Sequence, residues 1–229
     1  MEIRNGEQLE LERTAAESIK KQVEVVLEEK DKVIFGIVGG RSVKGVFEQL
    51  NDQSIPWEKV HIFMVDERLL PKDDLDTNIQ VAKEALLTKL VEDGQLPKEN
   101  VHEVDYTQGQ EQESVDAYLK EFQVFGGQYD IVLLSSGEDG HVGSLFPNSE
   151  GIKEEKETFV LVENAPKPPA TRMSASKGLI RKANMGIILF FGDGKKDAFE
   201  KFKDENVSVI ACPVKLSRGI ENLYVLGTS

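Results

Sequence analysis

The 229-residue sequence contains a single cysteine, Cys212, which excludes an intrachain disulfide and a zinc site built on cysteines. Histidine is nearly as scarce: only His61, His102 and His141 occur, and none has acidic partners at the spacing of a metal site. We therefore expect Cys212 to be a small buried core residue, and we expect no metal ion in the chemistry of this protein.

Long hydrophobic runs are also missing. No apolar segment approaches the ~20 residues of a membrane-spanning helix. Residues 1–12 are polar and acidic, whereas a secretory signal begins with basic residues and continues into an apolar core. We expect a cytoplasmic protein that does not contact a membrane.

Positive charge is in the minority, because 28 Lys and Arg residues stand against 41 Asp and Glu residues, a net charge of −13. Such a surface repels the phosphates of nucleic acids, so we expect no nucleic-acid partner. A small anionic ligand would have to be held by a local cluster of basic side chains and backbone N–H groups. The positions of the basic residues in loops are therefore informative.

What the sequence does contain is a regular alternation of apolar runs and amphipathic segments. The apolar runs predict strands over residues 32–38, 60–65, 101–104, 130–135, 159–163, 172–176, 185–191, 207–212 and 223–227. The amphipathic segments predict helices over residues 9–29, 42–50, 77–91, 111–125, 177–183 and 195–203. Thr77 and Gln80 form a capping box at the start of the third helix. The alternation predicts a single α/β domain over residues 1–229, with three layers, α/β/α, and a doubly wound, mostly parallel sheet.

Four polar loops follow predicted strands, at the sheet edge where ligands bind in such folds. They are Gly39–Ser42, Asp66–Arg68, Ser136–His141 and Gly192–Lys195. The first loop combines glycines with a helix start, which suits an anion, although a plain turn with Ser42 as the helix cap has the same pattern. The second loop could equally hold an exposed ion pair of little energetic value.

His141 follows a buried strand in the segment DIVLLSSGEDGHVGSLFPNS, residues 130–149. A neutral imidazole in that place can act as a general base, although a lone histidine is more often structural. Glu138 and Asp139 are both close enough in sequence to partner it, and the choice between them stays open. His61 and His102 lie in or at predicted strands, so we expect structural roles for them.

Several segments resemble the 6-phosphogluconolactonase family in the same order along the chain, from about Gly39 to Cys212. The resemblance is carried by GEDGHVGSLFP, VDERLLPKDDLDTN, PKPPATRMS and GDGKK. It implies a three-layer α/β/α fold shared with sugar-phosphate deaminases and isomerases. It also implies hydrolysis of 6-phosphoglucono-δ-lactone to 6-phosphogluconate in the pentose phosphate pathway, without a cofactor. We expect a monomer or a weak homodimer.

The resemblance also implies roles for individual residues. His141 would be the general base that activates water, Asp139 would support it, and Arg68 would stabilise charge on the lactone oxygen. The implied substrate contacts are Gly39, Gly40, Arg41, Ser42, Asp66, Gly140, Arg172 and Lys195. Within that set, the 6-phosphate would be held by Gly40, Ser42, Arg172 and Lys195.

The sequence departs from the family pattern in two loops. Arg41 and Val43 stand where the family commonly has G-G-S-T-P, and Ser135 replaces a glycine of the L-G-x-G segment. Two alternative functions remain. One is glucosamine-6-phosphate deamination, whose family has a glutamate where this chain has Phe146. The other is a non-catalytic sugar-phosphate-binding homologue.

Overall fold

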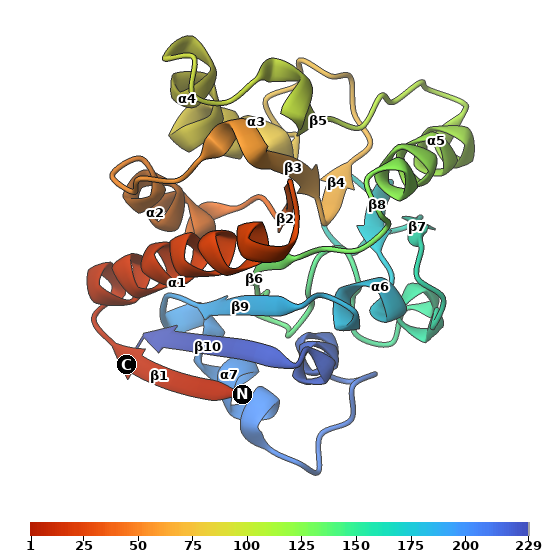
Figure 1. Ribbon diagram of the computed structural model, residues 1–229. Helices are drawn as coiled ribbons and strands as arrows, with labels where there is room; N and C mark the ends of the chain where they lie inside the picture. The colour runs from red at the N-terminus through yellow and green to blue at the C-terminus, as the bar shows by residue number, and fades with distance from the viewer. Residues whose placement is uncertain (229) are drawn as a thin grey trace.

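A computed structural model describes residues 1–228, and within them a seven-stranded, fully parallel sheet forms the centre of the molecule (Figure 1). Its strands are β1 (Glu2–Gly6), β2 (Val33–Ile37), β3 (Val60–Met64), β5 (Val101–His102), β6 (Ile131–Ser135), β9 (Met185–Phe190) and β10 (Asn222–Thr228). The spatial order is β1-β10-β9-β6-β2-β3-β5. The edge strand β1, near the N-terminus, lies beside β10, which ends at Thr228 (Figure 1).

The inner strands are continuous apolar runs because both of their faces are covered. All residues of β2 and β9 are buried, and so are the first four residues of β6. A parallel sheet is hydrogen-bonded by its backbone and needs apolar side chains on both faces to exclude water. The predicted strands at 32–38, 130–135 and 185–191 are confirmed, and so is the mostly parallel character of the sheet.

Helices cover the two faces of this sheet. They are α1 (Gln8–Glu29), α2 (Arg41–Leu50), α3 (Asn78–Ala82), α4 (Thr88–Glu92), α5 (Glu111–Val124), α6 (Lys177–Arg181) and α7 (Lys196–Lys203). A π-helical turn over Lys83–Leu87 joins α3 to α4, so the predicted helix 77–91 is one element with a distorted middle. Right-handed crossovers and the strand order together place α1 to α4 on one face and α5 to α7 on the other. None of the helices within residues 1–228 has the length and apolar character of a membrane span.

A second, antiparallel sheet stands beside the main one. It contains β4 (Asp66–Arg68), β7 (Phe159–Val162) and β8 (Arg172–Ala175) in the order β4-β8-β7. The strands predicted at 159–163 and 172–176 therefore exist, but they lie outside the parallel sheet. Residues 66–68, predicted as a loop, pair with β8 so that Arg68 lies opposite Arg172.

The predicted strand at 207–212 is wrong. These residues form turns, with Ile210 exposed. The Lys215 ammonium is buried and donates to the carbonyl oxygens of Asp204 and Val207. A side chain therefore occupies backbone acceptors that a neighbouring strand would otherwise need.

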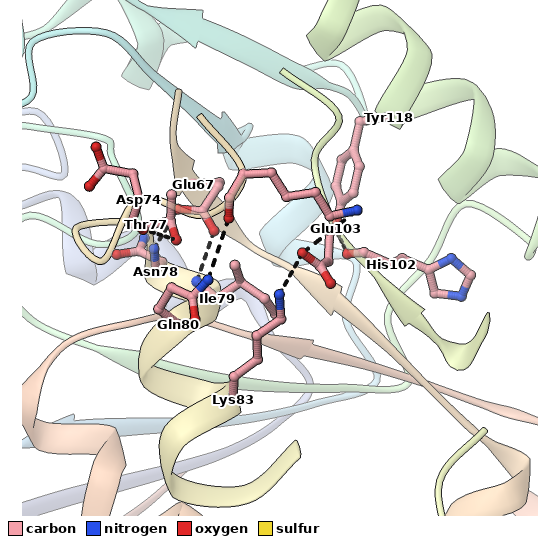
Figure 2. Close-up of polar contacts among 11 residues, drawn as sticks. Glu67, Asp74, Thr77, Asn78, Ile79, Gln80, Lys83, His102, Glu103 and Tyr118 are labelled. Carbon is pink, nitrogen blue, oxygen red and sulfur yellow. Dashed lines mark hydrogen bonds and ion pairs between the residues drawn. The ribbon is translucent and has the colours of Figure 1, made fainter. Parts of the chain in front are cut away.

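The predicted capping box at Thr77 and Gln80 is wrong in its chemistry, although the helix starts where it was expected. The Thr77 hydroxyl donates to the Asp74 carbonyl and does not cap α3. The buried Glu67 carboxylate accepts the backbone N–H groups of Asn78 and Ile79 at 2.6 and 2.9 Å (Figure 2). A side chain 11 residues earlier thus supplies the acceptors that the first N–H groups of the helix need.

The chain changes direction across the sheet between β2 and β6. From β2 it continues to β3 and β5 on one side, whereas from β6 it continues to β9 and β10 on the other. Loops that leave the carboxyl ends of two such strands diverge to opposite faces and open a crevice. The crevice of this molecule therefore lies where the Gly39–Ser42 and Ser136–His141 loops begin.

Candidate active site

A cleft of about 520 Å³ opens at the carboxyl ends of the parallel strands. The predicted site residues that line it are Gly39, Gly40, Arg41, Ser42, Asp66, Arg68, His141, Arg172 and Lys195. They come from the β2–α2 loop, β4, β8 and the segments after β6 and β9. Segments more than 150 residues apart in sequence, such as those of Ser42 and Lys195, therefore meet at one place.

The β2–α2 loop forms one wall of the cleft. Gly40, at φ 98°, is the residue before the helix, and α2 begins at Arg41. The first N–H groups of a helix have no partner inside the helix, so they are available to an anion. Ser42 does not cap the helix, so the alternative of a plain turn with Ser42 as the helix cap is wrong. Its hydroxyl accepts a hydrogen bond from the Lys195 ammonium at 2.7 Å.

Lys195 lies across the cleft on the turn Asp193–Lys195 that precedes α7. Its ammonium donates to the hydroxyls of Ser42 and Ser135, each at 2.7 Å. Burial and the charge of Arg41 lower the pKa of Lys195 to about 8, although the charge of Glu138 opposes this shift. An ammonium that is poorly solvated and beside another cation is a favourable partner for a dianion.

His141 is held in one orientation by Asp139. The His141 Nδ1 atom lies 2.5 Å from the Asp139 Oδ1 atom, which also accepts the His141 backbone N–H. Burial raises the pKa of Asp139, but the hydrogen bond and charge of His141 outweigh it and lower that pKa to about 2. The Asp139 carboxylate is therefore ionised at neutral pH and fixes the tautomer that carries its proton on Nδ1, which leaves Nε2 as a base.

The glycine before this pair is needed for space. The imidazole of His141 lies so close to Gly137 that a Cβ atom there would come within 2.0 Å of the ring. Any other residue at position 137 would displace the ring. The structure thus answers which acid partners His141: it is Asp139, while the exposed Glu138 lies against Gly194 on the lysine side.

Phe146 and Arg172 pack next to His141. The ring centroids of Phe146 and His141 are 4.7 Å apart, and the Arg172 guanidinium lies 5.5 Å from the Phe146 ring. Three hydrogen bonds to the carbonyls of Lys167, Pro168 and Pro169 hold Arg172 through Nε and Nη2. These contacts place Arg172 next to His141 and Phe146, and the three residues form what we call the histidine group of the cleft.

Asp66 and Arg68 project from β4 toward the same group. The buried Asp66 carboxylate accepts the Ser144 hydroxyl at 2.9 Å. Burial raises the pKa of Asp66, while Ser144 and the charges of Arg172 and His141 oppose that shift. Arg68 donates through Nη1 to the Asp76 carbonyl, and its buried Nε has no partner among residues 1–228.

Gly140 is the one predicted substrate contact that does not line the cleft. It is a buried turn residue with φ 86°, and a Cβ atom there would lie 2.8 Å from the Cys212 sulfur. The cleft is also lined by residues that were not predicted as site residues, among them Ser135, Asn78 and Gly143. Ser135 and Gly143 flank the histidine loop, and Asn78 stands within the VDERLLPKDDLDTN segment, so their positions in the motifs were the available signal.

The cleft is locally basic on an acidic protein. Five cationic side chains line it, Arg41, Arg68, Lys167, Arg172 and Lys195, against the three carboxylates of Asp66, Glu138 and Asp193. This is the local cluster that an anionic ligand requires on a chain of net charge −13. Within residues 1–228, no three His, Cys, Asp or Glu side chains come together as a metal site.

Comparison with known proteins agrees with this arrangement. Residues 6–224 match the family model described as glucosamine-6-phosphate isomerases/6-phosphogluconolactonase. The chain is 31% identical over 199 residues to 6-phosphogluconolactonase of Borreliella burgdorferi, covering 86% of this chain and 85% of that protein. It is 33% identical over 181 residues to that of Thermotoga maritima, covering 79% and 78%. The crystal structure of the Thermotoga maritima 6-phosphogluconolactonase superimposes with a TM-score of 0.85 and 26% identity, covering 100% of this chain and 99% of that one.

Proposed function

Because the chain belongs to the family of glucosamine-6-phosphate isomerases and 6-phosphogluconolactonases, we propose that it hydrolyses 6-phospho-D-glucono-1,5-lactone to 6-phospho-D-gluconate. The observation that carries this proposal is the His141–Asp139 pair, whose free Nε2 belongs to a histidine that lines a basic cleft. Ester hydrolysis at neutral pH needs such a base and a cationic partner for the oxyanion.

In the proposed reaction His141 accepts a proton from water at Nε2 while the water oxygen attacks the C1 carbonyl carbon. The carbonyl oxygen becomes an oxyanion, and Arg68, a cationic residue that lines the cleft, stabilises it. The tetrahedral intermediate then collapses, the bond from C1 to the ring oxygen breaks, and that oxygen takes the proton from His141. Asp139 keeps the imidazolium oriented throughout.

The 6-phosphate is proposed to bind at the other group of the cleft, formed by Lys195, Ser42, Arg41 and the backbone of Gly40. Support comes from the ammonium and hydroxyl that already converge there and from the start of α2. Fixing the phosphate at this end holds the lactone near His141 and makes the attack effectively intramolecular. Arg172, which the family resemblance implies as a phosphate ligand, is assigned to the histidine group instead, because it packs on Phe146 next to His141. Arg172 keeps its Nη1 group for the substrate, because the surrounding carbonyls use Nε and Nη2.

The family includes two reactions, and the surroundings of His141 favour hydrolysis. Ring opening of an amino sugar needs an acid partner, and the resembled deaminase segment has a glutamate at the position of Phe146. Here that position is a buried aromatic ring between His141 and Arg172, which offers no proton. We therefore propose that deamination of glucosamine 6-phosphate is not the reaction of this protein.

The cellular setting belongs to the same proposal. Residues 1–229 would act as one sugar-phosphate-binding domain, a monomer or weak homodimer, in the cytoplasmic oxidative pentose phosphate pathway. The reaction consumes only water and the lactone, and it uses groups that line the cleft together with Asp139, which does not line the cleft but holds His141.

The test is lactone hydrolysis measured against the spontaneous rate, which must be subtracted because this lactone opens by itself. His141→Ala should lower the enzymatic excess at least about hundredfold, the usual contribution of a general base, while 6-phosphogluconate still binds. Hydrolysis by the wild-type protein no faster than the blank refutes the proposal. Steady release of ammonia from glucosamine 6-phosphate would assign the alternative activity instead.

A further inference from the structure

Two serine hydroxyls, contributed by different elements, hold the ammonium of Lys195. Ser42 lies in the first turn of α2, and Ser135 is the last residue of β6. Both Oγ atoms are 2.7 Å from the Lys195 Nζ atom, and all three residues line the cleft. Ser42 already belongs to the proposed phosphate group, whereas nothing so far gives Ser135 a role.

Lys195, Ser42 and Ser135 together keep three hydrogen-bond donors that a ligand can use. An ammonium has three N–H bonds, and Lys195 uses two of them on the serines. Each serine oxygen accepts one of these bonds and keeps its own O–H. The Ser135 hydroxyl has the Ser136 carbonyl as a protein acceptor only at 3.5 Å, a long contact. One N–H and two O–H groups therefore converge on a space that a phosphate monoester, with its three terminal oxygens, would fill.

We propose that Ser135 is a specificity-determining residue that makes this end of the cleft selective for a phosphate monoester. This inference rests on the proposed function, since it deepens the recognition of the phosphorylated lactone. Ser135 acts in two ways: its O–H binds one phosphate oxygen, and its oxygen positions the Lys195 ammonium for another.

The positioning role follows from what competes for Lys195. Glu138 is exposed, lies against Gly194 and attracts the Lys195 charge. Without the Ser135 oxygen, only the Ser42 hydroxyl opposes the turn of the ammonium toward that carboxylate. Loss of the Ser135 hydroxyl should therefore weaken phosphate binding about tenfold, at the upper end for one neutral hydrogen bond.

The experiment compares Ser135→Ala, Ser135→Thr and the wild-type protein, with Ser18→Ala as the matched control. The Ser18→Ala substitution also removes one serine hydroxyl, but this hydroxyl lies on α1 outside the cleft, where it donates to the Thr14 carbonyl. The readouts are KM and kcat for 6-phosphogluconolactone, the calorimetric Kd of 6-phosphogluconate, the inhibition constant of inorganic phosphate, and the melting temperature.

We expect Ser135→Ala to raise KM, Kd and the phosphate inhibition constant about tenfold, with kcat within about twofold of wild type. Ser135→Thr, which keeps a hydroxyl, should recover most of the affinity, and Ser18→Ala should match wild type. Unchanged affinities in Ser135→Ala, or a fall in kcat at constant KM, overturns the inference. If the wild-type protein hydrolyses no lactone, the proposed function fails by itself, and the Kd of 6-phosphogluconate still decides the role of Ser135.

Discussion

Raising the pH from 7 to 9.5 should weaken the binding of 6-phosphogluconate by removing the charge of Lys195. Burial and the neighbouring Arg41 lower the pKa of this lysine from 10.5 to about 8, which corresponds to about 3 kcal/mol against its charged form. A phosphate dianion offsets that cost, so the protonated lysine is the form that binds. The second ionisation of a phosphate monoester is near pH 6 and is complete before this range begins.

The size of the effect follows from the fraction of Lys195 that is protonated in the free protein. With a pKa of about 8, that fraction is about nine tenths at pH 7 and about one tenth at pH 9. The apparent Kd should therefore rise about tenfold at pH 9 and about thirtyfold at pH 9.5. Below pH 7 the lysine is almost fully charged, and Lys195 should cause no further change.

The assay is titration calorimetry with 6-phosphogluconate, because the lactone itself opens quickly in base. Titrations at pH 9 in two buffers of different ionisation enthalpy should show uptake of about one proton on binding, since Lys195 must regain its charge. Lys195→Met should bind weakly at pH 7 and lose the pH dependence. A wild-type Kd that stays constant from pH 7 to 9.5, with no proton uptake, would refute the assignment of Lys195 as the phosphate ligand.

Three further substitutions test the roles of Glu138, Asp139 and Glu67. Glu138→Gln removes the charge that favours the protonated lysine, so the loss of 6-phosphogluconate affinity should begin at lower pH than in the wild type, as the same titrations would show. Asp139→Asn should lower kcat about hundredfold with Kd nearly unchanged, because the amide no longer selects the Nδ1–H tautomer of His141; an equal loss of Kd would contradict this role. Burial raises the folded-state pKa of Glu67 from 4.5 to about 7, so the wild-type free energy of unfolding should fall by about 2.5 kcal/mol between pH 5 and 8. Glu67→Gln should lack that fall in denaturant titrations, and a parallel pH dependence of the two proteins would show that Glu67 is not its source.

The parallel sheet and the position of the cleft were predictable because both follow from local patterns. A strand covered on both faces has to be an unbroken apolar run, as in β2 and β9. In a parallel sheet, the residues after such runs all emerge at one edge. The polar loops at Ser42, His141 and Lys195 were therefore expected to meet, and they do.

The small antiparallel sheet was not predictable in the same way. The pairing of Asp66 with Ser174 joins segments 108 residues apart, and β4 is a three-residue polar strand with no apolar run. At the start of α3, the local Thr77–Gln80 pattern was correct for a capping box, yet the distant Glu67 carboxylate takes that place. In both cases a tertiary contact decides the outcome, and a single sequence does not contain that pairing in local form.

The tripeptide Asp66-Glu67-Arg68 shows why the second sheet matters for the chemistry. A strand sends successive side chains to opposite sides, so Asp66 and Arg68 line the cleft while Glu67 points away and binds the start of α3. Asp66 anchors the loop after His141 through the Ser144 hydroxyl. Pairing with β8 places Arg68 opposite Arg172, so two cations are set side by side only because an antiparallel ladder holds their backbones. Burial and the charge of Arg68 lower the pKa of Arg172, and the carboxylate of Asp66 opposes this shift. The antiparallel sheet thus holds Asp66, Arg68 and Arg172 at the cleft, whereas the segments after β2 and β9 of the parallel sheet carry the proposed phosphate ligands.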